Sequence, residues 1–159
     1  LTVRDMGMVR QPVRVVISRG LNLPEDGKLA ESARDWPLWL MHGASATAAR
    51  REVFAGKGAR MFECGESAGS VYLVAALQAL GQAGLTRVFA EGGGSLAAAL
   101  LKADLVDELV LFSGGRVIGG DGLAAVAPLD HAVLEAAPRF CLRDQQTVGG
   151  DVVSYWTRA

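Results

Sequence analysis

The sequence has few cysteines, little aromatic content, no long apolar run and almost no net charge. It holds only two cysteines, Cys64 and Cys141, so neither a disulfide scaffold nor a zinc finger is expected, and both thiols are expected to be free in a reducing cytosol. Lysine and arginine total 16 against 17 acidic residues, and a net charge of −1 excludes an electrostatic binder of nucleic acid or of an anionic membrane. The longest helical-looking apolar run, residues 71–84, is too short for a membrane span.

Apolar residues make up 50% of the chain, and this high content excludes an intrinsically disordered protein. A chain of this length can bury about 70% of its unfolded surface. Because the sequence holds no linker, internal repeat or low-complexity tract, we expect a single domain over residues 1–159, soluble and cytoplasmic. It begins at Leu1 without an initiator methionine or a signal segment, so we expect a portion of something longer.

The order of apolar runs predicts an α/β fold. Strands and helices alternate as β-α-β-α-β, which implies right-handed crossovers and a mostly parallel central sheet with flanking helices. Ser45 and Ser70 stand where N-caps are expected, before two of the helices. The segment 21–35 holds several turn formers and is expected to be a surface connection. Strands are predicted at residues 12–17, 38–41, 59–62, 86–90 and 108–112, and helices at 46–54, 71–80 and 96–102.

The character of the sequence changes after residue 114. Glycine-rich loops lead to two further predicted strands, residues 138–142 and 152–156, on either side of a turn at 148–151. These strands are expected to form an antiparallel hairpin at the edge of the sheet.

The strongest local feature is a predicted buried strand that ends in three glycines and opens a helix, residues 87–96 (RVFAEGGGSL). The free amides and the dipole of a helix N-terminus suit a phosphate, and glycine permits a close approach. A tight turn that needs glycine explains the same residues about as well, because neither GxGxxG nor GxxxxGK[ST] is present. Glu91, just before the glycines, either accepts hydrogen bonds from a ligand or complements the helix dipole.

Other polar residues carry weaker signals. Arg4 could bind a phosphate in a bidentate manner, although most isolated arginines are solvated. His42 and His131 lack companions at metal-ligand spacing and are expected to be structural or at the surface. Asp121 lies in a glycine-rich turn, where it either binds a ligand or forms the turn. Neither GxSxG nor HExxH is present, so hydrolytic chemistry is poorly supported, and no metal site is expected.

Several segments together resemble one family. The opening LTVR, then PVRVVIS, then GLTRVFAEGGGSLAAALLKADLVDELVLF, then VIGGDGL and a late APRF follow in the order and spacing typical of the reductase domain of riboflavin biosynthesis. That domain has a dihydrofolate-reductase-like fold and is the C-terminal half of a bifunctional pyrimidine deaminase/reductase. The resemblance implies NADPH-dependent reduction of 5-amino-6-(5-phosphoribosylamino)uracil to its ribityl product, a homodimer, and a fused N-terminal zinc deaminase outside this chain.

The resemblance also implies site residues. Leu1 and Arg4 match the LTVR residues that contact the substrate, with Arg4 near the phosphate of the pyrimidine substrate, and Glu91 matches a substrate-contacting carboxylate. Arg19 would suit the 2′-phosphate of NADPH. No residue is an obvious proton donor for the developing alkoxide, so the catalytic residue is unknown. The stretch that matches the NADPH cradle is Gly93, Gly94, Ser95, Leu96, Ala97, Ala98 and Ala99.

Three departures from the family pattern qualify this interpretation. The first strand ends in Ile17-Ser18-Arg19 where the family usually has VxD and a short polar residue. The family's N-terminal strand and helix do not precede Leu1, and the deaminase signature HxE…PCxxC is absent. Two other functions stay open: a nucleotide-binding, reductase-like module without turnover, and a reductase of another pterin- or pyrimidine-like substrate.

Overall fold

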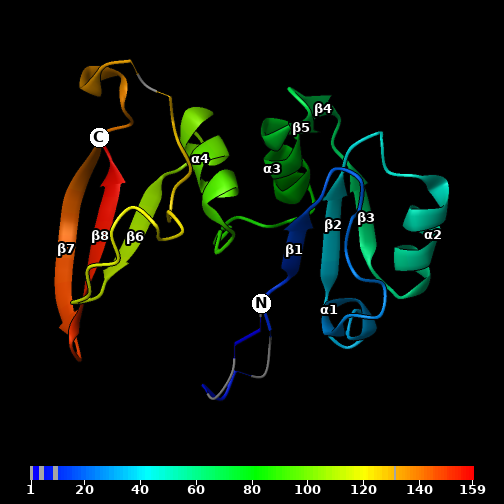
Figure 1. The fold of residues 1–159 in the computed structure, drawn as a ribbon. Coiled ribbons are helices and arrows are strands. Elements are labelled where there is room, and N and C mark those ends of the chain that lie inside the picture. The colour runs from blue at the N-terminus through cyan, green and yellow to red at the C-terminus, as the bar shows by residue number, and fades with distance from the viewer. Residues whose placement is uncertain (1, 4–5, 9–10, 131) are drawn as a thin grey trace. The chain divides into compact units, whose positions relative to one another are not determined.

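The computed structural model describes residues 2–3, 6–8, 11–130 and 132–159 (Figure 1). The chain forms two compact units, Leu1–Arg87 and Val88–Ala159, and each is described in turn. In the part of the chain that is described, no helix is both long and apolar enough to cross a membrane.

The first unit is built on a parallel three-stranded sheet in the order β1-β2-β3. The register sets Val16 of β1 beside Leu40 of β2, and Leu40 beside Met61 of β3. β-Branched and large apolar side chains favour such strands because they pack well on both faces of a covered sheet. The strands are β1 (Arg14–Ile17), β2 (Leu38–His42) and β3 (Arg60–Glu63).

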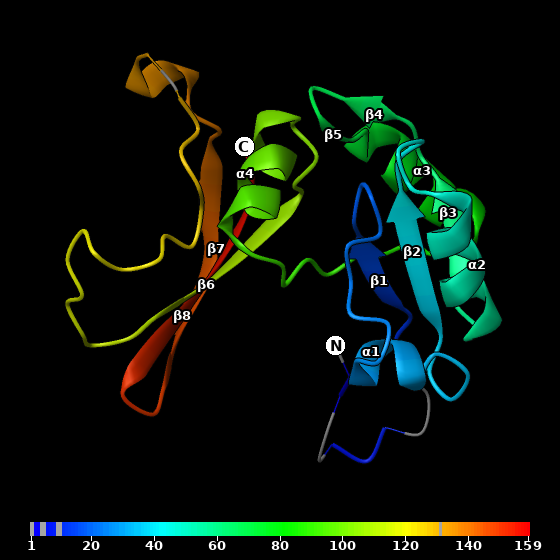
Figure 2. The same ribbon diagram turned by 45° about the vertical axis from the view of Figure 1, so that its right-hand side comes forward.

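Helices cover both faces of this sheet, and side chains from the two faces of β2 pack into two separate hydrophobic clusters. Leu38 and Leu40 belong to a cluster with Phe54 of α2, whereas Met41 belongs to a cluster with Leu80 of α3. Figures 1 and 2 show α2 and α3 on opposite sides of the sheet. The helices of this unit are α1 (Lys28–Glu31), α2 (Ala48–Gly56) and α3 (Leu73–Gln82).

Both predicted N-caps of these helices are wrong. The cap of α2 is Thr47, whose hydroxyl accepts a 3.3 Å hydrogen bond from the amide of Arg50, because the helix begins at Ala48, two residues later than the sequence predicts. Ser70 lies in a short hairpin, β4 (Glu66–Ser67) paired with β5 (Ser70–Val71), and α3 begins only after it. The predicted surface connection over residues 21–35 contains the one-turn helix α1.

The second unit holds one helix beside an antiparallel three-stranded sheet in the order β6-β8-β7. The predicted hairpin is confirmed, with a turn at Gly149, whose φ of +62° favours glycine. The hairpin was expected at the edge of the sheet, but only β7 is an edge strand, since β8 pairs with β6 on one side and with β7 on the other. The elements are α4 (Gly94–Lys102), β6 (Glu108–Ser113), β7 (Phe140–Val148), β8 (Asp151–Arg158) and a 3₁₀ turn at Leu134–Ala136.

The predicted strand at residues 86–90 is wrong. These residues pair with no strand in the part of the chain that the structure describes, and Phe89 is 77% exposed. A β-branched, aromatic run becomes a strand only where a neighbouring strand completes its hydrogen bonds, and the run itself does not reveal that neighbour. The α/β class itself is confirmed, with its parallel sheet and its antiparallel C-terminal hairpin.

Candidate functional site

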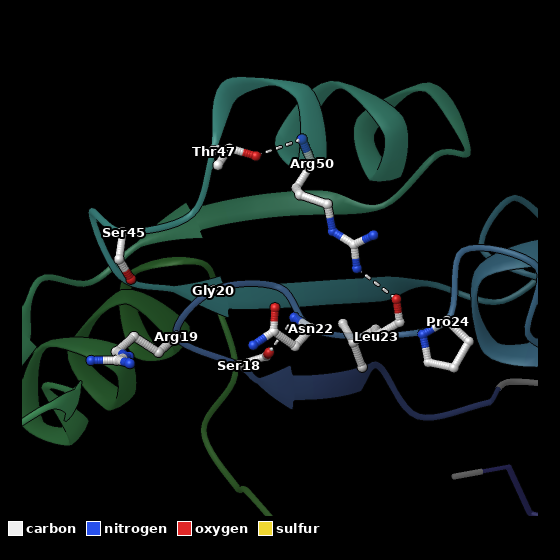
Figure 3. A pocket seen from close by; sticks show the side chains of 9 residues that line it. All are labelled: Ser18, Arg19, Gly20, Asn22, Leu23, Pro24, Ser45, Thr47 and Arg50. Atoms are coloured by element: carbon white, nitrogen blue, oxygen red, sulfur yellow. Dashed lines mark hydrogen bonds between the residues drawn. The ribbon is translucent and has the colours of Figure 1, made fainter.

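An open pocket of about 800 Å³ lies beyond the carboxyl ends of β1 and β2 (Figure 3). Ligands of α/β proteins commonly bind at the carboxyl ends of the parallel strands, because the loops there diverge and leave a crevice. Hydroxyl, amide and guanidinium groups dominate its wall, as suits a polar or anionic ligand. The lining residues are Ser18, Arg19, Gly20, Asn22, Leu23, Pro24, Ser45, Thr47 and Arg50.

Arg19 is the more available of the two arginines in this pocket. Its side chain is 52% exposed, and its guanidinium lies 3.8 Å from the Glu66 carboxylate, a loose ion pair. Figure 3 shows it on the side of the pocket where Ser45 lies, with its guanidinium directed away from Arg50. A guanidinium held in this way has donors free for a ligand phosphate.

Glu66 connects the loops that follow β1 and β2. Its Oε1 accepts a 2.8 Å hydrogen bond from the amide of Ser45, while Oε2 faces Arg19. The hydrogen bonds from the side chain and the amide of Ser45, together with the charge of Arg19, hold the pKa of this carboxyl below its usual range. Gly43 makes room for the carboxylate, since a Cβ there would lie 2.3 Å from Oε1.

Arg50 is bound by its own chain. It donates from Nε and Nη2 to the carbonyl of Leu21, at 3.2 and 2.6 Å, and from Nη2 to that of Leu23 at 2.7 Å. Its Nη1 also forms a short charge-assisted hydrogen bond with Glu25. Although Arg50 lines the pocket, these donors are directed into the pocket wall.

The second unit holds the predicted glycine loop, and its helix begins two residues earlier than expected, at Gly94. The amides of residues 92–95 donate no backbone hydrogen bond to any described residue, so they are available to an anion. A Cβ at Gly93 would meet nothing within 4 Å, which leaves open space at this helix terminus. These are the properties that a phosphate site at a helix N-terminus requires.

Gly94, in contrast, is required by the chain itself. A Cβ there would lie 2.7 Å from the carbonyl oxygen of Ala124 and 3.1 Å from the amide of Ala127, which donates a 3.0 Å hydrogen bond to the Gly94 carbonyl. The segment 124–127 thus packs directly on the start of α4. Close approach of protein backbone accounts for glycine at this position.

The other predicted site residues are distributed as follows. Glu91 and Ser95 are exposed, and Ala98 is buried at 4% exposure, so its side chain faces the interior of the unit. The remaining residues of the predicted NADPH cradle, Leu96, Ala97 and Ala99, are half-buried on α4. Leu1 and Arg4, predicted to contact the substrate, lie outside the described residues, as does His131.

His42 and Cys64 are both buried in the first unit. The Nδ1 of His42 lies 2.9 Å from the carbonyl oxygen of Gly43, in line with the structural role expected of this histidine. Burial raises the pKa of the Cys64 thiol, with a further contribution from Glu63. Both cysteines are free thiols, as predicted.

Sequence reasoning missed Glu66 and Arg50. The signal available for the pocket was the set of polar residues in the loops after two predicted parallel strands, Ser18-Arg19 and Ser45 with Thr47. Glu66 and Arg50 carry no such signal, because their roles depend on loops that meet only in the folded chain.

Comparison with known proteins identifies the family. Residues 1–154 match the RibD C-terminal domain. The riboflavin biosynthesis protein RibD of Escherichia coli (strain K12) is 28% identical over 158 residues, covering 91% of this chain and 37% of the relative. RibD of Bacillus amyloliquefaciens is 28% identical over 120 residues, covering 76% of this chain and 32% of the relative. The chain therefore spans about a third of the length of these curated relatives.

Solved structures agree with this assignment. Acinetobacter baumannii RibD superposes with a TM-score of 0.75 at 23% identity over 94% of this chain and 38% of that chain. The riboflavin biosynthesis reductase Rib7 of Saccharomyces cerevisiae gives a TM-score of 0.69 at 19% identity over 94% and 66%. These likenesses confirm the predicted fold, and the match over residues 1–154 confirms the predicted family. The chain belongs to the RibD C-terminal domain family.

Proposed function

We propose that this chain is the reductase domain that reduces 5-amino-6-(5-phosphoribosylamino)uracil to 5-amino-6-(5-phosphoribitylamino)uracil with NADPH, in riboflavin biosynthesis. The observation that carries the proposal is the match of residues 1–154 to the RibD C-terminal domain. The name of the yeast neighbour, a riboflavin biosynthesis reductase, supports the reaction class.

The residues of each unit fit the phosphate groups of NADPH. In the first unit, the half-exposed guanidinium of Arg19 at the mouth of the pocket suits the 2′-phosphate that distinguishes NADPH from NADH. In the second unit, the free amides of residues 92–95 and the open space beside Gly93 suit another phosphate. Half-buried small side chains on α4 would let the cofactor lie close to the helix. This cradle comprises Gly93, Gly94, Ser95, Leu96, Ala97, Ala98 and Ala99.

Three residues are proposed for the substrate. Arg4 would bind the phosphate of the phosphorylated pyrimidine, and Leu1 lies three residues before it in the same LTVR segment. Glu91 would accept hydrogen bonds from the polar edge of the pyrimidine or the ribose, for which its exposure leaves it available.

NADPH supplies the hydride when bound, and the chain contributes orientation. The ring-opened sugar carbonyl must lie about 3–3.5 Å from the hydride donor. Binding the substrate phosphate at Arg4 and its polar edge at Glu91 would fix both ends of the substrate. The carbonyl would take up a hydride on carbon and a proton on oxygen, from water or from a residue upstream of this segment, so that the sugar becomes a ribityl chain.

Partners are proposed on the same basis. The E. coli relative is more than twice as long as the segment it shares with this chain, which supports a fused N-terminal zinc deaminase. The exposed apolar side chains of the antiparallel sheet, among them Phe112 at 71% exposure, support a homodimer.

The test is an assay of NADPH oxidation by the full-length protein with the phosphoribosylamino pyrimidine as substrate. We expect oxidation that depends on the substrate, and a ribityl product identified by mass spectrometry. Tight NADPH binding without oxidation would instead support a nucleotide-binding module. Oxidation only with another pterin or pyrimidine would support a reductase of that substrate.

A further inference from the structure

We propose that Arg50 is a positioning residue that holds one wall of the pocket beyond β1 and thereby sets the affinity for NADPH. The inference rests on the proposed function, in which Arg19 binds the 2′-phosphate in this pocket. Arg50 would act through the wall segment formed by residues 21–25, and not through contact with the cofactor.

The wall segment begins in a strained conformation. Leu21 has a φ of +56°, which a leucine adopts only where its surroundings require it, and its side chain is fully buried in the first core cluster. Its amide donates a 3.1 Å hydrogen bond to the carbonyl of Ser18, and the amide of Asn22 donates a 3.1 Å hydrogen bond to the Ser18 hydroxyl. These contacts fix the start of the segment.

Arg50 fixes the rest of the wall. Its guanidinium donates hydrogen bonds to the carbonyls of Leu21 and Leu23 and to the carboxylate of Glu25, which are every second residue of the segment. Figure 3 shows the side chain reaching from α2 down to the Leu23 carbonyl, beside Pro24. The planar guanidinium can serve all three acceptors at once, whereas a lysine ammonium, as a single point charge, cannot hold that geometry.

The backbone amide and the guanidinium of Arg50 together connect the wall segment to α2. The backbone amide of Arg50 is the donor in the N-cap with Thr47, another pocket residue, and its guanidinium lies 5.4 Å from the centre of the Phe54 ring in the core. One residue thus links the loop after β1 with the helix after β2. Without it, the wall segment would keep the buried Leu21 side chain and the 2.8 Å hydrogen bond from the Leu23 amide to the Leu21 carbonyl, but it would lose the guanidinium contacts to the Leu23 carbonyl and the Glu25 carboxylate.

The neighbouring arginine is a matched control. Arg51 lies on the same helix and forms an ion pair of similar exposure with Glu63, at 3.6 Å, but it does not line the pocket. Arg50→Ala and Arg51→Ala therefore remove the same charge from the same helix. Only the first removes donors from the pocket wall.

The experiment uses the full-length protein and two measurements. NADPH is titrated by its fluorescence, and hydrogen exchange of the amides of Asn22, Leu23 and Glu25 is followed without ligand. We expect Arg50→Ala to raise the dissociation constant of NADPH about tenfold, the size expected from losing charge-assisted hydrogen bonds, and to speed exchange in this segment. Arg51→Ala should change neither. Under turnover, KM for NADPH should rise while kcat stays near its original value.

The outcomes are distinct. Faster exchange with unchanged NADPH affinity, or equal effects of Arg50→Ala and Arg51→Ala, would overturn the proposal. If Arg50→Ala does not fold, Arg50→Lys and Glu25→Gln replace it. Each should weaken NADPH binding less than tenfold, and unchanged binding in both would also overturn the proposal. Arg19→Ala tests the placement of NADPH separately, because unchanged affinity in that variant would show that NADPH binds elsewhere.

Discussion

Arg14, at the start of β1, donates a 2.8 Å hydrogen bond from Nη1 to the hydroxyl of Ser32. Its Nη2 donates to the carbonyl oxygens of Ser32 at 3.0 Å and Trp36 at 2.5 Å. The residue is only 4% exposed, and burial lowers the pKa of its guanidinium, an effect that the charge of Asp35 opposes. A buried cation thus organises the turn that leads into β2, at the opposite end of the sheet from the pocket.

We expect Arg14→Leu to lower the free energy of unfolding by about 2–4 kcal/mol, because it removes the guanidinium donor from the carbonyl of Trp36 and one of the two donors from the carbonyl of Ser32, which keeps the amide of Trp36. Ser32→Ala should cost only about 1 kcal/mol, since both carbonyl contacts persist. Urea denaturation measures both values. NADPH affinity is the control and should stay unchanged in the folded variants. A loss in Arg14→Leu no larger than in Ser32→Ala would contradict this account.

The two glycines at the start of α4 should respond differently to substitution. At Gly93 a Cβ projects into open space, so Gly93→Val should leave the fold intact and weaken NADPH binding about tenfold by blocking close approach of a phosphate. At Gly94 even alanine would collide with the backbone of Ala124. Gly94→Ala should therefore lower the thermal midpoint as well as the affinity. Unchanged NADPH affinity in Gly93→Val would remove this loop from the cofactor site.

Glu66 should make the stability of the first unit depend on pH. Because the pKa of its carboxyl is lowered in the folded chain, ionised Glu66 contributes stability above the ordinary pKa of a glutamate. That contribution is lost as the pH falls through the lowered pKa. Glu66→Gln keeps an acceptor for the Ser45 amide but has no charge for Arg19. The difference in unfolding free energy between the two proteins should be present at neutral pH and shrink on acidification. A difference that grows in acid would have the wrong sign.

Arg4 is proposed to bind the phosphate of the substrate. Arg4→Ala in the full-length protein should raise KM for the phosphorylated pyrimidine about tenfold, because a bidentate guanidinium–phosphate contact is lost. NADPH affinity should remain nearly unchanged, since neither Arg19 nor the glycine loop is altered. Steady-state kinetics with each substrate varied in turn measures both effects. Unaltered kcat and KM would show that Arg4 does not bind the substrate and is a solvated arginine.

The sequence was sufficient for features that depend on local pattern. The strands around Val16, Leu40 and Leu109 and the hairpin turn at Gly149 follow from β-branched runs and turn residues. The helix after the glycines also follows, with its start displaced from Leu96 to Gly94.

Features that depend on distant partners were not predictable. The strand wrongly predicted at residues 86–90 and the central position of β8 both depend on the pairing of strands in the sheet. The sequence of a single strand does not encode its pairing partners. The hydrogen bond from the amide of Ser45 to Glu66 joins residues 21 positions apart, and the pattern around Ser45 does not encode it. The same reasoning explains why Arg50 was missed, since its acceptors lie 25 to 29 residues earlier in the chain.

The last prediction concerns assembly. β7 is an edge of the antiparallel sheet, and its side chains are exposed from Cys141 to Val148, with Leu142 at 50% exposure. A long exposed edge with apolar side chains promotes pairing unless something covers it, and a two-fold partner is the commonest cover. We therefore expect a homodimer, with β7 or the opposite edge strand, β6, near the interface.

Light scattering of the full-length protein at micromolar concentration should give the mass of a dimer, and a monomer mass would refute the expectation. Leu142→Glu should then dissociate the dimer. Trp156→Glu is a poorer probe, because Trp156 lies on the central strand β8 and is half-buried. Val133→Glu, at a residue 58% exposed and outside the sheet, is the matched control and should remain dimeric. A dimer that survives Leu142→Glu would move the interface to β6, where Phe112→Glu tests it.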